Sequence, residues 1–384
     1  MDKTDILGTF NAGATLGPVN ETNMARIWNK HKQSNTPHKR KVFVGMSGGV
    51  DSSVASALLK KEEHQVIGVF LKPWQPKYGL AYCNWKKDRL DALKVAVHLG
   101  IPFETWDISK EYFERVTKYM IDGYSSGMTP NPDVMCNKEI KFGIFLEKAI
   151  ERGADFVATG HYARVEKIKE EFRLLKGLDN TKDQSYFLWT LKQDQLKHCL
   201  FPLGNLEKKE VRQIAKKLGL PNYDKKDSQG VCFVGTMDMK EFLKEYIKHK
   251  KGIIKNQKGD IIGVHDGVVF YTTGQRHGFI INNSSGPYYI TKKNIPENEL
   301  IVSKIQPQNK SFDISQLSWV RETGKTIKKI KIATRYRQKP VSAKIIKLNN
   351  KKMTVTLSGA SLATSGQSAV IYNGDEIIGG GVII

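Results

Sequence analysis

The chain is poor in cysteine and has no long apolar run, and both absences narrow what it can be. Its 384 residues include only four cysteines, Cys83, Cys136, Cys199 and Cys232, too few and too widely spaced for a disulfide framework. No two of them form Cys-x-x-Cys, which argues against a zinc ribbon or a cysteine-ligated iron–sulfur cluster, and we expect no metal site built by the protein. No segment reaches the roughly 18 apolar residues that span a bilayer, and no hydrophobic signal core follows Met1. We therefore expect a protein of a reducing compartment, the cytoplasm, with no membrane segment.

Acidic residues are scarce relative to basic ones. The chain has 39 Asp and Glu against 61 Lys and Arg, a formal net charge of +22. Residues 242–384 hold 23 Lys and Arg against 9 Asp and Glu, so most of the excess lies in the last third. This asymmetry predicts a polyanionic partner bound there, although lysine used merely as a solvated surface residue is the plainer alternative.

The pattern of the chain changes three times along its length. Residues 1–40 show no sustained periodicity and predict a poorly ordered extension, or a mitochondrial or plastid transit peptide as the alternative. Residues 41–241 alternate short apolar strands with amphipathic helices, which is typical of a Rossmann-like α/β domain with a parallel sheet covered on both faces. We expect strands at 41–46, 65–71, 103–107 and 155–159, and helices at 52–63, 86–99, 110–124 and 138–152.

Short apolar stretches separated by Gly, Asn and Asp turns follow after about residue 250. Such spacing predicts β structure, and we divide it into a small central domain, 242–305, and a C-terminal β-barrel, 306–384. Residues 326–348, 352–358 and 366–384 are the expected barrel strands.

The segment Lys41-Val-Phe-Val-Gly-Met-Ser-Gly-Gly-Val-Asp51-Ser-Ser53 predicts a strand, a glycine-rich loop and a helix start. Such a loop can bring backbone N–H groups to an anion, assisted by the helix dipole. It is not a Walker A loop, because no Gly-Lys-Ser/Thr follows. Ligands of parallel sheets bind at the carboxyl ends of the strands, which places Ser47, Leu71 and Gly160-His161 on one rim. The alternative is an ordinary glycine-rich turn.

Two cysteines lie in loops of polar and conformationally special residues. Cys136 follows Thr129-Pro-Asn-Pro-Asp133, and we expect the helix to begin after it. A helix N-terminus and two nearby lysines would together lower the pKa of its thiol. Asp133 is close enough in sequence to act as a general base. Cys232 lies in Asp227-Ser-Gln-Gly-Val-Cys-Phe-Val-Gly235. By contrast, Cys199 reads as a buried apolar residue, and Cys83 receives no role.

Together these segments closely resemble the tRNA-specific 2-thiouridylases, a family of PP-loop ATP pyrophosphatases. The resemblance runs from about Lys41 to the C-terminus and is carried by Gly-Met-Ser-Gly-Gly-Val-Asp-Ser-Ser (45–53), Thr-Pro-Asn-Pro-Asp-x-x-Cys-Asn-Lys-Glu-Ile-Lys-Phe (129–142), Ala-Thr-Gly-His-Tyr (158–162), Lys-Asp-Gln-Ser-Tyr-Phe-Leu (182–188), Lys-Asp-Ser-x-Gly-Val-Cys-Phe (226–233), Thr-x-Gly-Gln-Arg (272–276), Thr-Arg-Tyr-Arg (334–337) and Ser-Gly-Gln-Ser-Ala-Val (365–370). Ser365 stands where the family more often has proline, and residues 1–40 are unmatched.

The resemblance implies ATP-dependent replacement of the C2 oxygen of the wobble uridine by sulfur. It implies that ATP, with Mg²⁺, adenylates that oxygen, that Cys232 carries a persulfide, and that Cys136 releases the sulfur, leaving a Cys136–Cys232 disulfide. Asp133 would activate a thiol or water. The implied ATP site comprises Gly45, Met46, Ser47, Gly48, Gly49, Val50, Asp51, Ser52, Leu71 and Gly160. The implied contacts with the target base are Asn131, Pro132 and Asp133, and those with tRNA are His161, Lys182, Asp183, Gln184, Arg335, Tyr336 and Gln367.

The implied partners are tRNAs for Glu, Gln and Lys, and a cysteine desulfurase or sulfur-relay protein as donor; we expect a monomer. Three alternatives stay open among the residues: His161 as a satisfied strand-end histidine, Arg335-Tyr336 as a solvated strand face, and 182–184 as a plain turn. Two stay open for the whole chain. One is another PP-loop adenylating enzyme, such as an amide ligase, which would leave Cys136 and Cys232 unused. The other is a non-catalytic RNA-binding protein, against which the intact loop and both cysteines argue.

Overall fold

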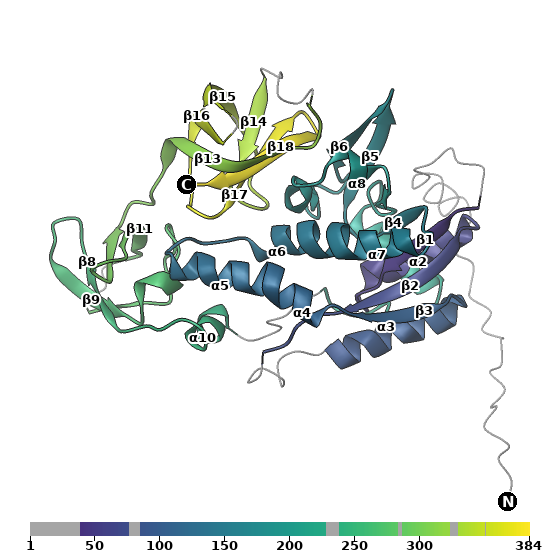
Figure 1. Ribbon diagram of the computed structural model, residues 1–384. Coiled ribbons are helices and arrows are strands. Elements are labelled where there is room, and N and C mark those ends of the chain that lie inside the picture. Colours follow the sequence, from purple (N-terminus) through teal and green to yellow (C-terminus); the bar gives the residue numbers. More distant parts are fainter. Residues whose placement is uncertain (1–38, 77–84, 228–237, 283–285, 323–328, 350) are drawn as a thin grey trace, which may run out of the picture.

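The computed structural model describes residues 39–76, 85–227, 238–282, 286–322, 329–349 and 351–384, which form three sheets with connecting helices (Figure 1). Almost all of the expected extension lies outside these residues, as do Cys83 and Cys232. In the described part of the chain, no helix is both long and apolar enough to cross a membrane.

The first sheet is parallel throughout, with the strand order β3-β2-β1-β4-β7. Its strands are β1 (Lys41–Gly45), β2 (Gln65–Lys72), β3 (Phe103–Asp107), β4 (Phe156–Ala158) and β7 (Cys199–Leu200). Successive side chains of β1 face opposite sides of the sheet, as a strand requires. Val42 and Val44 pack with α2 (Val50–Lys61), α3 (Trp85–Leu99) and α9 (Lys208–Lys217), whereas Phe43 packs with α7 (Phe145–Glu151). The predicted parallel sheet with helices on both faces is confirmed.

Two long helical segments connect these strands. The first consists of α4 (Ser109–Tyr112), the π-helical η1 (Phe113–Thr117) and α5 (Lys118–Ser125). The second consists of α6 (Pro132–Met135), the π-helical η2 (Cys136–Ile144) and α7. The shorter elements η3 (Ser185–Leu188) and α8 (Gln193–Leu196) lead to β7.

The prediction that the second helix starts at residue 138 is wrong, because it starts at Pro132. Asn131 is its N-cap, and its side-chain oxygen accepts a hydrogen bond from the Val134 backbone N–H at 3.2 Å. Proline is well suited to the first helical position, where no backbone N–H is needed. Cys136 therefore lies inside the helix and not before it.

The second sheet has the order β10-β9-β8-β12-β11 and forms the central domain. It packs on α5 through a core that includes Met120, Phe242, Tyr271 and Ile290. Its elements are α10 (Met239–Lys244), β8 (Gly252–Lys255), β9 (Ile261–His265), η4 (Val268–Phe270), β10 (Ile280–Ile281), β11 (Tyr289–Asn294) and β12 (Glu299–Ser303).

The third sheet is an antiparallel barrel closed by pairing of its first strand with its last. Its strands are β13 (Asn309–Trp319), β14 (Ile330–Ala333), β15 (Val341–Leu348), β16 (Lys352–Ser361), β17 (Ser368–Asn373) and β18 (Glu376–Ile383). The predicted C-terminal β-barrel is confirmed. The hairpin of β5 (Ala163–Ile168) and β6 (Glu171–Lys176), from the first domain, extends this sheet by pairing with β18, which the sequence pattern did not indicate. In Figure 1 this hairpin stands beside the barrel strands.

Candidate active site

The glycine-rich loop joins β1 to the N-terminus of α2. Gly48 has φ +76°, a left-handed conformation that favours glycine, and Gly49 is the N-cap of α2 without a side-chain cap. The first backbone N–H groups of a helix have no partner within the helix. A loop without a capping side chain therefore leaves donors that suit an anion, and a phosphate group fits this cradle.

Three serines hold the loop in shape. The Ser52 hydroxyl accepts a hydrogen bond from the Ser47 backbone N–H at 3.2 Å and donates to the Gly49 carbonyl at 3.1 Å. The Ser53 hydroxyl donates to the same carbonyl at 2.9 Å. Beside them, Met46 is buried and its N–H donates to the Val69 carbonyl, and Val50 is buried at the start of α2.

The predicted rim is formed, because β2, β1 and β4 are neighbours in the parallel sheet. Leu71 lies near the carboxyl end of β2, and Gly160 follows β4. A Cβ added to Gly160 would lie 2.7 Å from the Ser52 backbone nitrogen, so only glycine permits this approach of the strand end to the loop. Gly45, Leu71 and Gly160 thus lie at one edge of the parallel sheet, the edge from which the loop of Ser47 extends.

An ion network at this cradle includes residues that sequence reasoning missed. The Lys208 ammonium contacts the Asp51 carboxylate at 2.7 Å and Asp227 at 2.8 Å, and only 13% of its side chain is exposed. The Tyr162 hydroxyl donates to Asp51 at 2.9 Å. Burial, and then the Asp51 charge, raise the pKa of Tyr162 far above its usual range, so this hydroxyl stays a donor.

Asp227 is the centre of the same network. Lys182 contacts it at 2.8 Å and Arg212 at 2.7 Å, in addition to Lys208. Burial opposes its ionisation, yet the hydrogen bonds from Lys182 and Lys208 outweigh that effect and hold the pKa of this carboxyl well below its usual range. Asp227 is five residues before Cys232 in the sequence. The sequence carried no local signal for Lys208, which begins α9 and lies 157 positions after Asp51.

The segment Thr129–Asp133 lies between the first domain and the barrel. The Gln367 side chain donates to the Thr129 carbonyl at 2.8 Å, and the Thr129 N–H donates to the Ser365 carbonyl at 2.9 Å. Gly366 has φ +90°, and a Cβ there would lie 2.7 Å from the Thr129 nitrogen. The barrel therefore holds the segment that leads into the helix of Cys136.

Cys136 is 7% exposed and lies four residues into the helix that Pro132 begins. The expected location at a helix N-terminus is therefore wrong, and so is the part of the expected lowering of the thiol pKa that relied on the helix dipole. Burial raises the pKa of the Asp133 carboxyl above its usual range, and the positive charge of Lys141 offsets part of this rise. Cys199 is buried, and burial raises the pKa of its thiol above the usual range, as expected of an inert cysteine.

His161 joins the loop rim to the cysteine helix. Its Nδ1 lies 2.7 Å from the Thr159 hydroxyl and its Nε2 lies 3.5 Å from the Lys141 ammonium. Its ring packs on Phe142 and Phe201, and 7% of the residue is exposed. Burial, with Lys141 adding to it, holds the pKa of His161 well below its usual range, so the imidazole is neutral.

Three family models match the chain in succession. They are described as a tRNA methyl transferase HUP domain (residues 40–236), a tRNA methyl transferase PRC-barrel domain (240–304) and an aminomethyltransferase beta-barrel domain (309–383). The chain is 44% identical over 353 residues to the tRNA-specific 2-thiouridylase MnmA of Geobacillus thermodenitrificans, and the aligned region covers 90% of this chain and 95% of that protein. It is 43% identical over 350 residues to the protein of the same name from Listeria monocytogenes serotype 4a, covering 89% and 94%. The chain belongs to the tRNA-specific 2-thiouridylase family.

Most of the side chains that the family resemblance assigned to tRNA binding make hydrogen bonds or ion pairs to other residues of this 2-thiouridylase. Asp183 accepts hydrogen bonds from the backbone N–H groups of Gly177 and Ser185, at 3.0 and 3.1 Å. The Gln184 side-chain oxygen accepts from the Tyr162 N–H at 3.2 Å. With Lys182 paired to Asp227, these side chains serve the turn and the ion network in this structure, and their contact with tRNA stays a prediction, as does that of His161.

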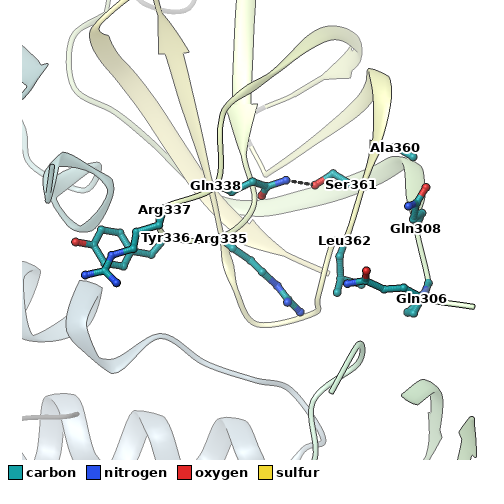
Figure 2. A pocket seen from close by; sticks show the side chains of 10 residues that line it. Gln306, Gln308, Arg335, Tyr336, Arg337, Gln338, Ala360, Ser361 and Leu362 are labelled. Atoms are coloured by element: carbon teal, nitrogen blue, oxygen red, sulfur yellow. Dashed lines mark hydrogen bonds between the residues drawn. The ribbon is translucent and has the colours of Figure 1, made fainter. Parts of the chain in front are cut away.

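Arg335 and Tyr336 are half-buried where the barrel meets the central domain and the first domain. Arg335 donates to the Thr273 carbonyl of the central domain at 3.1 Å and to the Thr364 hydroxyl at 3.1 Å. Tyr336 packs on Phe187, with 4.4 Å between the ring centroids. Arg335 borders two cavities, one of about 360 Å³ on the barrel (Figure 2) and one of about 740 Å³ that Gln367 and the 274–278 loop also line.

Proposed function

We propose that this 2-thiouridylase adenylates the C2 oxygen of a tRNA wobble uridine and then replaces that oxygen with sulfur from a persulfide on Cys232. The observation that supports this best is the contact of the two candidate centres. The helix that holds Asp133 and Cys136 packs against the phosphate-cradle rim, where Lys141 and Phe142 meet His161. A base activated at the cradle would therefore lie close to the thiol.

The first step needs an ATP site, and the loop of Gly45–Ser52 with Leu71 and Gly160 fits one. The backbone N–H groups at the start of α2, which have no partner within the helix, would donate to phosphate oxygens. Mg²⁺ bound to ATP would neutralise part of the charge of the triphosphate. The uridine O2 attacks the α-phosphorus, the bond to pyrophosphate breaks, and the C2 oxygen becomes part of a leaving AMP.

The second step transfers sulfur. The terminal sulfur of the Cys232 persulfide attacks C2, and AMP leaves with the oxygen. The Cys136 thiolate then attacks the inner sulfur of Cys232, and the sulfur–sulfur bond breaks with its electron pair going to the uridine. The products are 2-thiouridine and a Cys136–Cys232 disulfide, which an external thiol must reduce. Asp133, whose raised pKa favours proton uptake, would receive the proton of Cys136.

The substrate set also belongs to this proposal. The target base leaves the anticodon stack and meets Asn131, Pro132 and Asp133. The acceptors are tRNAs for Glu, Gln and Lys, the sulfur donor is a cysteine desulfurase or a relay protein, and the enzyme acts as a cytoplasmic monomer. Residues 41–241 form the domain for adenylation and thiolation, residues 242–305 form the small central domain, and residues 306–384 form the barrel that binds tRNA.

Mass spectrometry of nucleosides tests the proposal. Wild-type protein with ATP, Mg²⁺, a desulfurase, cysteine, a thiol reductant and tRNA should yield 2-thiouridine, and omission of ATP should abolish it. Cys232→Ser should yield none, because an alcohol cannot carry a transferable sulfur. Cys199→Ser is the matched control and should retain activity. Formation of 2-thiouridine by the Cys232→Ser protein with the desulfurase as sole donor would refute the assignment.

A further inference from the structure

Asn222 lies on the segment between α9 and Asp227, and its side chain reaches the glycine-rich loop. Its Nδ2 donates to the Gly48 carbonyl at 2.9 Å and to the Ser53 hydroxyl at 3.0 Å. The residue is only 5% exposed, which shields both hydrogen bonds from competing water. Because a carbonyl oxygen can only accept, the contact with Gly48 fixes which end of the amide is the nitrogen.

The other end of this amide argues against a purely structural role. Its Oδ1 is buried and has no hydrogen-bond partner among the residues that the structure describes. A buried acceptor without a partner costs free energy, and an apolar side chain of similar shape, such as that of leucine, would avoid this cost. The amide therefore serves its contact with the loop rather than the packing around it.

The contact with Gly48 sets the direction of the next backbone N–H group. The Gly48–Gly49 peptide bond is trans, so its C=O and its N–H point to opposite sides. With the carbonyl held toward the buried amide, the Gly49 N–H points away from it, toward the exposed Ser47 hydroxyl at 3.4 Å. An N–H···O contact of this length is weak, so the donor is available to a stronger acceptor such as a phosphate oxygen.

A hydrogen bond from outside the loop is needed because this peptide plane lies between two glycines. Without a Cβ on either side, rotation of the plane is hindered much less than between other residues. A side chain at Gly48 cannot supply the restriction, because its φ is +76° and a Cβ there would lie 2.1 Å from the Asp88 carbonyl of α3. The amide of Asn222 therefore selects one orientation of a plane that the loop itself leaves free.

The segment that carries this amide is itself fixed by two helices. The Lys225 ammonium contacts two carboxylates of α3, Asp88 and Asp91, both at 2.7 Å. The Arg212 guanidinium of α9 donates to the Tyr223 carbonyl at 3.1 Å. The amide is thus held in place against the loop before any ligand binds.

We propose that Asn222 is a positioning residue for ATP, which holds the Gly48 carbonyl and thereby directs the Gly49 N–H toward a phosphate group of the nucleotide. Asn222 acts through the loop and touches no reacting atom. This inference rests on the proposed function, in which ATP is the ligand of the phosphate cradle.

The test compares ATP binding with turnover in the full-length protein. Asn222→Leu keeps the approximate volume of the side chain and removes both ends of the amide. Calorimetry with ATP and Mg²⁺, without tRNA, should show binding weakened about tenfold, the loss of one hydrogen bond to a charged group. In thiolation assays KM for ATP should rise by a similar factor, whereas kcat at saturating ATP and KM for tRNA should stay within about twofold of wild type.

Two further variants complete the comparison. Asn222→Ser carries a hydroxyl too short to reach the Gly48 carbonyl and should weaken ATP binding to a similar extent; if Asn222→Leu does not fold, this variant provides the same comparison. Tyr223→Leu is the matched control, because it changes the next residue of the segment, 43% exposed, and leaves the amide in place. It should retain the wild-type affinity for ATP. Melting temperatures show which variants are folded at the assay temperature.

The outcomes separate this inference from the proposed function. Wild-type affinity for ATP in folded Asn222→Leu or Asn222→Ser protein that thiolates tRNA would overturn the inference alone. A lower kcat with an unchanged KM for ATP would also overturn it, because a structural defect reduces the active fraction without changing nucleotide affinity. An equal loss of affinity in Tyr223→Leu would overturn it as well, since the effect would then belong to the segment in general. Wild-type protein that neither binds ATP nor needs it for thiolation would overturn both.

Discussion

Lys208 contacts two carboxylates with one ammonium group, and it joins Asp51 to the cluster of Asp227, Lys182 and Arg212. Without it, Asp51 would lose the cation that lies between it and Asp227, whereas Asp227 would keep Lys182 and Arg212. We predict that Lys208→Met lowers ATP-dependent kcat/KM by about 100-fold, the size of effect expected when a reacting group is misplaced by about 1 Å. The fold should be destabilised by about 1–3 kcal/mol, because charged groups in a partly buried network lose their partner.

Lys209 provides the matched control for this experiment. It is the next residue of the same helix, its side chain is 76% exposed, and it pairs only with Glu207 among the described residues. Lys209→Met should retain both activity and stability, since exposed ion pairs contribute little. Equal effects of the two substitutions on AMP release would show that Lys208 does not act through the network.

His161 gives the protein a dependence on pH. Its folded-state pKa is well below that of an unfolded histidine, about 6.5, so below pH 6.5 the unfolded chain binds a proton that the folded chain does not. This histidine should therefore lower the free energy of unfolding as pH falls from 6.5 to 5, by up to about 1.4 kcal/mol per pH unit. Denaturant unfolding of His161→Gln should show a shallower dependence in this range. His98→Gln, at an exposed histidine, is the control, and an unchanged pH dependence in His161→Gln would contradict the buried neutral assignment.

At the scale of elements, the start of the cysteine helix shows how one residue directs a segment. Asn131 caps this helix, so Asn131→Ala should lower the free energy of unfolding by about 1 kcal/mol, whereas Asn131→Ser, which can still cap, should lose much less. Thermal unfolding of both variants checks this. Equal stabilities would mean that the cap contributes nothing, and thiolation rates would then report the contact of Asn131 with the base separately.

The same helix shows what the sequence could and could not indicate. The two prolines of Thr129-Pro-Asn-Pro suggested an extended loop, although the second suits a first helical turn, and the start was misplaced by six residues. By contrast, β1 and β2 follow their apolar patterns closely, because a buried parallel strand must be apolar on both faces. The edge strand β3 is only half-buried and carries Glu104 and Thr105, yet its predicted bounds also agree with the structure. The contact of Lys208 with Asp51 could not be found from the sequence, since it joins residues 157 positions apart.

At the scale of the whole molecule, the barrel and the first domain share one apolar cluster, in addition to the core that each has of its own. Phe43 of the parallel sheet and Leu188 belong to the same apolar cluster as Val370 and Ile377 of the barrel. The β5–β6 hairpin pairs with β18 along this junction. The sequence pattern marked a boundary near residue 306 by its change of texture, but pairing between distant strands leaves no such local mark.

A buried ion pair lies where hairpin and barrel meet, and it allows this junction to be tested. Arg321 and Glu376 are 8% and 7% exposed, with Nε and Oε1 2.6 Å apart, and Arg321 also contacts Glu171 of the hairpin at 3.3 Å. Arg321→Met leaves Glu376 buried with only Arg173, at 3.8 Å, as a cationic partner among the described residues, so the substitution should cost about 3 kcal/mol of unfolding free energy. The double variant Arg321→Met/Glu376→Leu should recover most of that loss, since apolar residues of similar volume can replace such a pair. Denaturant unfolding should show the Arg321→Met loss both in fluorescence and in protection of β5–β6 from hydrogen exchange, because one core unites the two regions. A hairpin that keeps full protection while the barrel is destabilised would mean that the two unfold independently and that the shared core does not couple them.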